Sequence, residues 1–212
     1  ESFTMPANNL ILYAQWGINE YTITFDSAGG TTITPTTQNY GTAIIIPEPP
    51  SLEGFSFAGW HPAIPAAMPA ENITLTAQWT TDKHTLTYIA DSTGSITGNA
   101  GQEVEHGADG TLVKAIPNEG WRFVRWDDGS TDNPRTDTNV TGDIAVTAIF
   151  HMLGDVNANG IIDSADLVLA LKTLSSVPVS ETIHTDADVD GDGKIGLAEV
   201  IYIFHALSEK NK

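Results

Sequence analysis

The sequence predicts a multidomain protein in which two small β-rich domains precede an all-α region with two loop–helix motifs. Two observations lead to this prediction. Segments that alternate apolar and polar residues, as half-buried strands do, recur in two successive units before residue 151. After residue 151, a loop rich in Asp and Asn leads twice into apolar residues at helical spacing. We expect domains at residues 20–80, 81–150 and 151–212, preceded by the tail of another repeat at residues 1–19.

Composition narrows the range of partners. With 27 acidic and 9 basic residues, the 212-residue chain has a formal net charge of -18, which argues against nucleic acid or an anionic membrane surface as partner. The absence of cysteine leaves no disulfide framework, thiolate metal site or cysteine nucleophile. No apolar run reaches the roughly 18 residues of a membrane span, so we expect no membrane insertion.

An internal repeat organises the N-terminal part. Residues 5–16 recur as residues 68–79, since both segments begin Met-Pro-Ala and end Ala-Gln-Trp. The first segment therefore predicts the end of a preceding repeat, and residues 21–79 form the first complete unit. Within this unit, residues 21–25 and 73–79 alternate as strands, and Ala-Gly-Gly at 28–30 predicts a turn.

The second unit carries the same marks, with predicted strands at residues 86–89, 120–126 and 144–150. Each unit contains one copy of the pattern G-aromatic-x-F-x-x-W, at residues 54–60 in the first unit and 120–126 in the second. Recurring aromatics in domains this small favour a core role over a sugar-stacking platform. We expect Trp60, Trp79 and Trp126 to lie in the core, and Trp121 and its counterpart Phe55 to be the exceptions.

On these strands, turns and aromatic motifs, the first unit resembles a Listeria-Bacteroides repeat, the β-grasp-like module also called an internalin B-repeat. The second unit is similar to the divergent form of that repeat. The resemblance implies tandem spacers or surface modules of secreted bacterial proteins, without catalysis.

The C-terminal region contains two calcium-type loops, the first loop at residues 155–166 and the second loop at residues 188–199. Calcium prefers six to eight oxygen ligands, and loops of this class supply them at alternate positions, with Gly at the sixth. The first loop offers Asp155, Asn157, Asn159, the Ile161 carbonyl, Asp163 (directly or through water) and Asp166. The second loop offers Asp188, Asp190, Asp192, the Lys194 carbonyl and Glu199. We therefore expect two Ca²⁺ ions.

Each loop runs into a helix, but no helix with a comparable apolar stripe precedes either loop. This arrangement resembles the type I dockerin over residues 153–208, which implies calcium-dependent binding of a cohesin domain. The residues that the family would use to contact cohesin are Ser164, Ala165 and Lys172 in the first motif and Leu197, Ala198 and His205 in the second. Because the two sets differ, we expect one preferred orientation. The helices should pack through Leu167, Leu171 and Leu174 against Val200, Phe204 and Leu207.

No catalytic constellation is recognisable. The six histidines show neither H-x-x-x-H spacing nor a pairing with Asp or Glu on one helical face. We therefore expect a secreted or cell-surface, non-catalytic assembly protein. Two alternatives remain open: an adhesin whose repeats bind a host protein or a surface glycan, and the non-catalytic tail of a large secreted enzyme.

Overall fold

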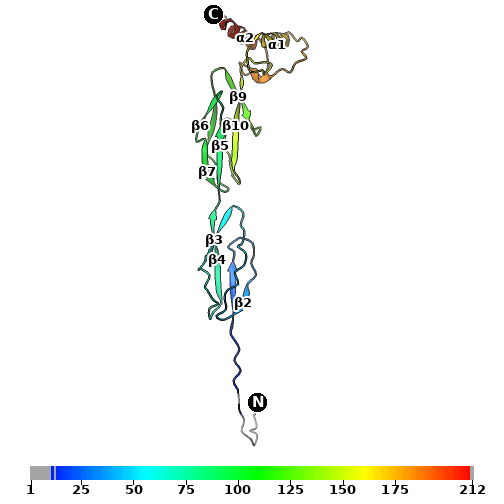
Figure 1. Ribbon diagram of the computed structural model, residues 1–212. Helices are drawn as coiled ribbons and strands as arrows, with labels where there is room; N and C mark the ends of the chain where they lie inside the picture. Colours follow the sequence, from blue (N-terminus) through cyan, green and yellow to red (C-terminus); the bar gives the residue numbers. More distant parts are fainter. Residues whose placement is uncertain (1–10, 12, 211–212) are drawn as a thin grey trace. The chain divides into compact units, whose positions relative to one another are not determined.

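The computed structural model describes residue 11 and residues 13–210. Residues 1–10, 12 and 211–212 lie outside the described residues, and so does most of the segment predicted to end a preceding repeat. The chain divides into two compact units, Glu1–Asp82 and Lys83–Lys212. Strands occur in both units, whereas the α-helices of the described residues belong to the second (Figure 1).

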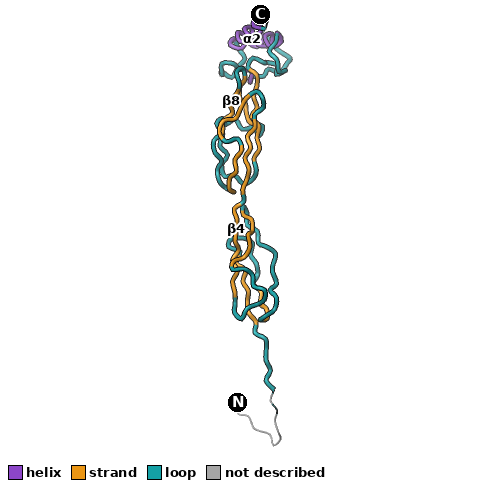
Figure 2. Tube along the Cα trace, turned by 60° about the vertical axis from the view of Figure 1, so that its left-hand side comes forward, coloured by secondary structure: helices purple, strands orange, loops and turns teal. Residues whose placement is uncertain are grey.

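The first unit contains one mixed sheet, seen as orange strands in Figure 2. Its strands are β1 (Glu20–Asp26), β2 (Thr36–Asn39), β3 (Phe55–His61) and β4 (Ile73–Thr81). The order is β2-β1-β4-β3, in which the central strands β1 and β4 are parallel and both outer pairs are antiparallel. The strands predicted at residues 21–25 and 73–79 are confirmed.

Side-chain alternation places the core of the first unit on one face of this sheet. The buried core residues are Ile23, Phe25, Met68 and Leu75. Trp60 packs edge-on against Phe25 with ring centroids 5.0 Å apart, which confirms its core role. Phe55 is exposed, as expected for the exception in this motif.

The second unit repeats the topology of the first. Its strands are β5 (Lys83–Ile89), β6 (Gly94–Gly98), β7 (Gly101–Glu105), β8 (Val113–Pro117), β9 (Trp121–Trp126) and β10 (Ile144–Met152). The sheet order β7-β5-β10-β9 again has a central parallel pair, β5 and β10, and β6 pairs separately with β8. Trp126 is fully buried in its core, and Trp121 packs at the edge of that core. Four short strands were not predicted: β2, β6 and β7 are rich in polar residues or glycine, and β8 has only five residues, the last of them proline.

The C-terminal region of the second unit contains helix α1 (Ser164–Leu174), a short 3-10 turn η1 (Thr185–Ala187) and helix α2 (Leu197–Glu209). The predicted loop–helix order is confirmed. The expected packing of these helices is wrong in part, since Leu171, Leu174 and Phe204 are exposed. The buried cluster is formed instead by Val156, Leu169, Ala170, Ala187, Ile195 and Ile203, with Leu167, Val200 and Leu207 partly buried against it. Leu167, Val200 and Leu207 therefore face inward as predicted, whereas Leu171, Leu174 and Phe204 do not.

Candidate metal centre

The first loop wraps its backbone around its own side-chain oxygens. The Asp155 carboxylate accepts N–H bonds from Asn159 at 3.1 Å and Gly160 at 2.8 Å. The Asp166 carboxylate accepts N–H bonds from Asn157 at 3.1 Å and Asp163 at 2.9 Å. Asp155 and Asp166 are both buried. Each end of the loop is thus hydrogen-bonded to backbone N–H groups within the loop.

The second loop has nearly the same pattern of hydrogen bonds. The Asp188 carboxylate accepts N–H bonds from Gly191 at 2.7 Å and Gly193 at 2.8 Å. The Glu199 carboxylate accepts N–H bonds from Val189 at 2.8 Å and Gly196 at 2.6 Å. The duplication in sequence therefore produces duplicate loop geometry.

Glycine is required at the sixth position of each loop. Gly160 and Gly193 have φ angles of 86° and 78°, in the left-handed region that residues with a side chain rarely occupy. Each of these glycines donates its N–H to the first Asp of its own loop. The turn therefore points a backbone donor at the carboxylate that begins the loop.

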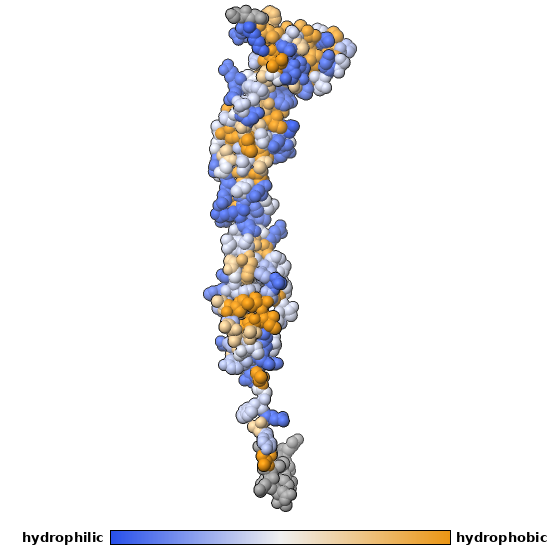
Figure 3. All heavy atoms as spheres, in the orientation of Figure 1, coloured by the Kyte–Doolittle hydropathy of each residue, from blue (hydrophilic) through white to orange (hydrophobic). Residues whose placement is uncertain are grey.

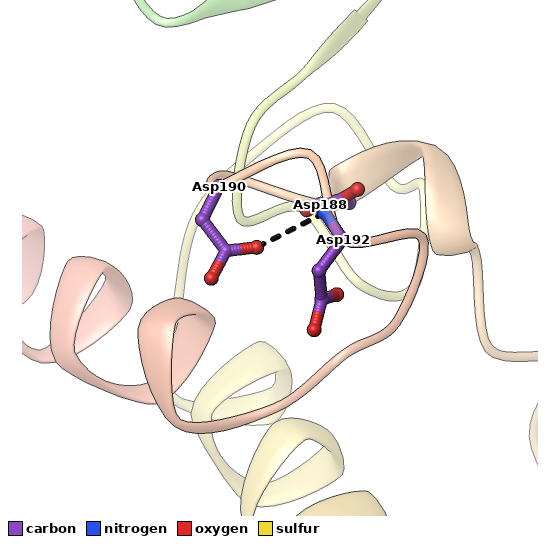
Figure 4. Close-up of side chains that lie close together, drawn as sticks. All are labelled: Asp188, Asp190 and Asp192. Atoms are coloured by element: carbon purple, nitrogen blue, oxygen red, sulfur yellow. Dashed lines mark hydrogen bonds between the residues drawn. The ribbon is translucent and has the colours of Figure 1, made fainter.

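The carboxylates of the second loop form a cluster. Asp188, Asp190 and Asp192 each place an oxygen within 4.8 Å of the others, and Figure 4 shows the three side chains on one turn of the loop. The dashed line there marks the Asp192 N–H donating to Asp190 at 3.2 Å. Like charges this close repel one another unless a cation lies among them. The cluster suits a hard divalent cation with oxygen ligands.

Both loops have buried carboxylates among their predicted ligands. Asp166, Asp188 and Glu199 are almost completely buried, and an isolated buried carboxylate is costly unless it is paired or binds a metal. The pKa of Asp188 is lowered: burial acts to raise this pKa, but hydrogen bonds from Gly193, Gly191 and Arg122 outweigh burial. Asp188 is therefore ionised at neutral pH, the form that binds a cation.

The remaining predicted ligands lie nearer the surface. Asn157 and Asp163 are half-buried, while Asn159, Ile161 and Lys194 are exposed. Asp163 also accepts the Ala165 N–H at 2.7 Å and so caps helix α1. A single side chain in the first loop therefore begins a helix and stands at a predicted ligand position.

The predicted partner-binding residues fall on two dissimilar surfaces. Ser164, Ala165 and Lys172 line one shallow groove beside α1, together with Val168 and Glu181. Leu197 lies on the outer side of α2, where it is joined by Ile201 at 59% exposure and Phe204 at 65%. Apolar atoms of the C-terminal region are visible at the surface in Figure 3. Ala198 is half-buried and His205 is exposed.

The structure corrects one expectation about histidine and reveals a further pair. His205 lies 3.7 Å from Glu209, four residues later on α2, so the expectation of no such pairing on a helical face is wrong. Both side chains are largely exposed. His84 and His106 lie 3.1 Å apart (Nε2 to Nδ1) because β5 and β7 are paired neighbours. Only strand pairing brings these two histidines together, and β7 was not predicted.

Sequence reasoning also missed Arg122. This residue lies on β9 of the second sheet, and its Nη1 donates to the Oδ2 of Asp188 at 3.0 Å. Arg122 and Asp188 are 66 residues apart in the chain, so no local pattern indicated their ion pair. The aromatic motif around it drew attention to Trp121 and Trp126 instead.

Three family models match successive segments of the chain. The model of the Listeria-Bacteroides repeat domain matches residues 21–78, and that of the divergent InlB B-repeat domain matches residues 84–152. The model of the dockerin type I domain matches residues 153–198, ending just before Glu199. The three matches confirm the order of the resemblances drawn from the sequence.

Two bacterial proteins illustrate the relatives that this sequence matches. A protein of Evansella cellulosilytica named as a Gly-rich membrane protein is 33% identical over 162 residues, which cover 70% of this chain and 18% of that protein. Internalin H of Listeria monocytogenes is 41% identical over 85 residues, 36% of this chain and 15% of its own length. The chain thus spans less than a fifth of either relative.

Among solved structures, streptococcal SHIRT domains 3-4 from a cell surface protein match at 17% identity and a TM-score of 0.25. This match covers 63% of this chain and 97% of that one, a superposition too poor to indicate a common fold.

Proposed function

From a chain that consists of a Listeria-Bacteroides repeat, a divergent InlB B-repeat and a type I dockerin domain, we propose a non-catalytic assembly protein. Its dockerin binds a cohesin domain in a calcium-dependent manner, and the β repeats act as spacers. The observation that carries this proposal is the pair of loops with buried carboxylates, each leading directly into a helix.

The proposed domains are residues 20–80, 81–150 and 151–212, after the end of another repeat at 1–19. The division between the two compact units, after Asp82, supports the first boundary. The shared strand order with a central parallel pair supports a β-grasp-like description of both repeats. The two helices and one 3-10 turn support an all-α dockerin among the described residues.

Each loop is proposed to hold one Ca²⁺ ion. The ligands in the first loop are Asp155, Asn157, Asn159, the Ile161 carbonyl, Asp163 and Asp166; those in the second are Asp188, Asp190, Asp192, the Lys194 carbonyl and Glu199. The second loop contributes four carboxylates and the first only three, so the second should bind calcium more tightly. When bound, calcium neutralises the clustered carboxylates. Calcium binding is thereby coupled to folding of the region.

Cohesin is proposed to contact one of the two dissimilar surfaces in preference to the other. The α1 surface presents Ser164, Ala165 and Lys172 in a groove that Val168 and Leu169 also line, whereas the α2 surface presents Leu197, Ala198 and His205 beside the exposed Ile201 and Phe204. The two surfaces differ at equivalent positions, with Ser164 against Leu197 and Lys172 against His205, so one is not a copy of the other. The prediction of a single preferred orientation rests on this difference.

The protein is proposed to act outside the cell, where calcium is plentiful. The match to a bacterial protein named as a Gly-rich membrane protein supports this location. Among the residues that the structure describes, none of the helices combines the length and apolar character needed to cross a bilayer.

A second candidate function is adhesion through the repeats themselves. Tyr40, Ile45 and Ile46 are each exposed on the first unit, and we propose that these residues form the adhesive surface, since exposed apolar patches often mark interaction sites. Figure 3 shows apolar atoms at the surface of this unit. Binding of a host protein or a glycan at this patch should persist in a calcium chelator, because the patch is remote in sequence from both loops.

Calorimetric titration of the full chain with purified type I cohesin domains tests the leading proposal. Binding should appear in millimolar calcium and vanish in EGTA. With one preferred orientation, either Ser164→Asp or Leu197→Asp should weaken binding at least tenfold while the other leaves it nearly unchanged. Equal losses would contradict a single mode, and calcium-independent binding would contradict the proposed mechanism.

A further inference from the structure

The C-terminal region joins the second sheet without a spacer. Strand β10 ends at Met152 and the first loop begins at Asp155, so only Leu153 and Gly154 lie between them. The Leu153 N–H donates to the Gly120 carbonyl, and the Gly154 N–H to the Ala187 carbonyl, each at 2.9 Å. This connection is therefore hydrogen-bonded both to the start of β9 and to the turn that precedes the second loop.

Arg122 extends from β9 to the second loop at this junction. Its Nη1 lies 3.0 Å from the Oδ2 of Asp188, whose side chain is fully buried, while the Arg122 side chain is 42% exposed. Among the described residues, no other Lys or Arg forms an ion pair with a predicted calcium ligand. The loop with the larger number of carboxylates thus receives its one cationic partner from another domain.

The two oxygens of Asp188 have different environments. Oδ2 accepts two donors, the Gly193 N–H and Arg122, whereas Oδ1 accepts only the Gly191 N–H. A donor on one oxygen of a metal-binding carboxylate fixes the orientation of the whole group. In the first loop, Asp155 has backbone donors but no such cation.

Other contacts hold the same junction. His151 of β10 lies 3.1 Å from Asp186 of η1. Tyr202 of α2 packs so closely on Gly154 that a Cβ there would lie 2.9 Å from its ring. The η1 turn and helix α2, which flank the second loop, therefore both contact the end of β10 or the connection after it.

An ion pair at a protein surface usually contributes little, because solvent screens it and ordering the side chains costs entropy. Arg122 differs from that case because its acceptor is buried and begins a calcium-type loop. When Arg122 holds the Asp188 carboxylate in place, the loop has less order to gain on binding a cation. The pairing should therefore affect cation binding more than general stability.

We propose that Arg122 of the divergent repeat is a positioning residue for the second calcium loop, so that calcium binding there and docking of the dockerin on β9 and β10 are linked. The inference rests on the proposed calcium function. Linkage is reciprocal: if docking raises the calcium affinity of the second loop, then calcium strengthens docking by the same factor. The first loop lacks this contact, so its calcium affinity should not change when Arg122 is substituted.

The test is a calcium titration of the full chain followed by NMR at the amides of Gly160 and Gly193. Each of these amides donates to the first Asp of its own loop, so each reports one loop. In Arg122→Met, the calcium concentration at the midpoint of the Gly193 titration should rise about tenfold. This is the lower end of the loss in metal affinity that follows removal of a hydrogen bond to a metal ligand. The midpoint at Gly160 should stay within twofold of wild type. Arg122→Lys keeps the charge but not the planar fork, so its calcium midpoint at Gly193 should lie between those of wild type and Arg122→Met.

Arg125→Met is the matched control, because Arg125 lies on the same strand and its Nη1 donates to the Trp126 carbonyl rather than to a loop. It should leave both midpoints unchanged. Hydrogen exchange at the Leu153 and Gly154 amides supplies a second readout: wild type should lose protection in EGTA, and Arg122→Met should show reduced protection even in calcium.

Three results would overturn the inference: an unchanged Gly193 midpoint in Arg122→Met, an equal weakening of both loops, or tighter binding at the second loop. If wild type shows no calcium response at either glycine, the calcium proposal itself fails. Loss of cohesin binding with intact calcium titrations would instead contradict only the proposed partner.

Discussion

Arg135 links separate segments of the second unit from a nearly buried position. Its Nε and Nη2 donate to the two oxygens of Asp137 at 2.9 and 2.7 Å, and its Nη1 donates to Asp128 at 2.7 Å. The Tyr88 hydroxyl donates to Asp137 at 2.6 Å, and the guanidinium lies 5.5 Å from the centre of the Trp126 ring. Charge-assisted, forked bonds of this kind are stronger than neutral ones.

We predict that Arg135→Met lowers the free energy of unfolding of the second repeat by about 3 kcal/mol, because it leaves the poorly exposed Asp137 without its cation. Urea unfolding followed by tryptophan fluorescence measures this loss. Arg135 lowers the pKa of Asp137 through its hydrogen bond; at Asp128, burial raises the pKa, but bonds from Ser130 and Arg135 outweigh it. Stability from depressed carboxyl pKa values is present above the unfolded value of about 3.9 and is lost as pH falls through the native values. The difference between wild type and variant should therefore shrink in acid.

Arg125→Met serves as the comparison, since Arg125 is exposed and its Nη1 bonds only a carbonyl. Its loss should stay within about 0.5 kcal/mol. Equal destabilisation by the two variants would show that the Arg135 network has no special role.

At the scale of elements, helix α2 has two faces of similar apolar character but opposite environment. Ile203 is fully buried in the cluster between the loops and helices, whereas Ile201 is 59% exposed. Both are isoleucines near the middle of the helix, so their intrinsic helix propensities are the same. Any difference between them must come from packing.

Ile203→Ala should lower the free energy of unfolding of the C-terminal region by about 3 kcal/mol, because it removes buried methyl groups and leaves a cavity. Ile201→Ala should change it by no more than about 0.5 kcal/mol. Thermal unfolding followed by circular dichroism in saturating calcium compares the two. A larger loss at Ile201 would mean that α2 packs through its other face.

At the scale of the whole molecule, the unit Glu1–Asp82 contains neither of the two loops proposed to bind calcium, whereas Lys83–Lys212 contains both. The two units also form separate sheets and separate cores. Loss of calcium should therefore act on the second unit and leave the first unaffected.

Calorimetry of the full chain should show an unfolding transition that moves to lower temperature in EGTA and another that does not move. At free calcium one hundred times the dissociation constant, each bound ion stabilises the folded state by about 2.7 kcal/mol. The transition that stays constant should belong to the first unit, which limited proteolysis before and after each transition can identify. A shift of every transition, or of none, would contradict this division.

Several features were predictable because they depend on residues close together in the chain. The loops at 155–166 and 188–199, the helices that follow them and the central strands of both sheets were correctly located, since spacing and alternation determine them. Edge strands such as β2 escaped notice, because their pairing depends on a neighbour's backbone more than on their own side chains. On α2, Val200 and Leu207 were correctly assigned to the inward face, but Phe204 was not, because apolar residues lie on both faces of this helix.

Contacts between distant segments could not be found in this way. His84 meets His106 only because β5 pairs with β7, and Arg122 meets Asp188 only because the second loop folds back on the start of β9. Local order in the chain specified which groups could bind a cation and which segments could form helices or strands. Packing decided which of those groups are buried, which faces stay open to a partner, and which domain supplies the charge beside the second loop. Such choices depend on long-range burial and pairing, and no short stretch of residues encodes them.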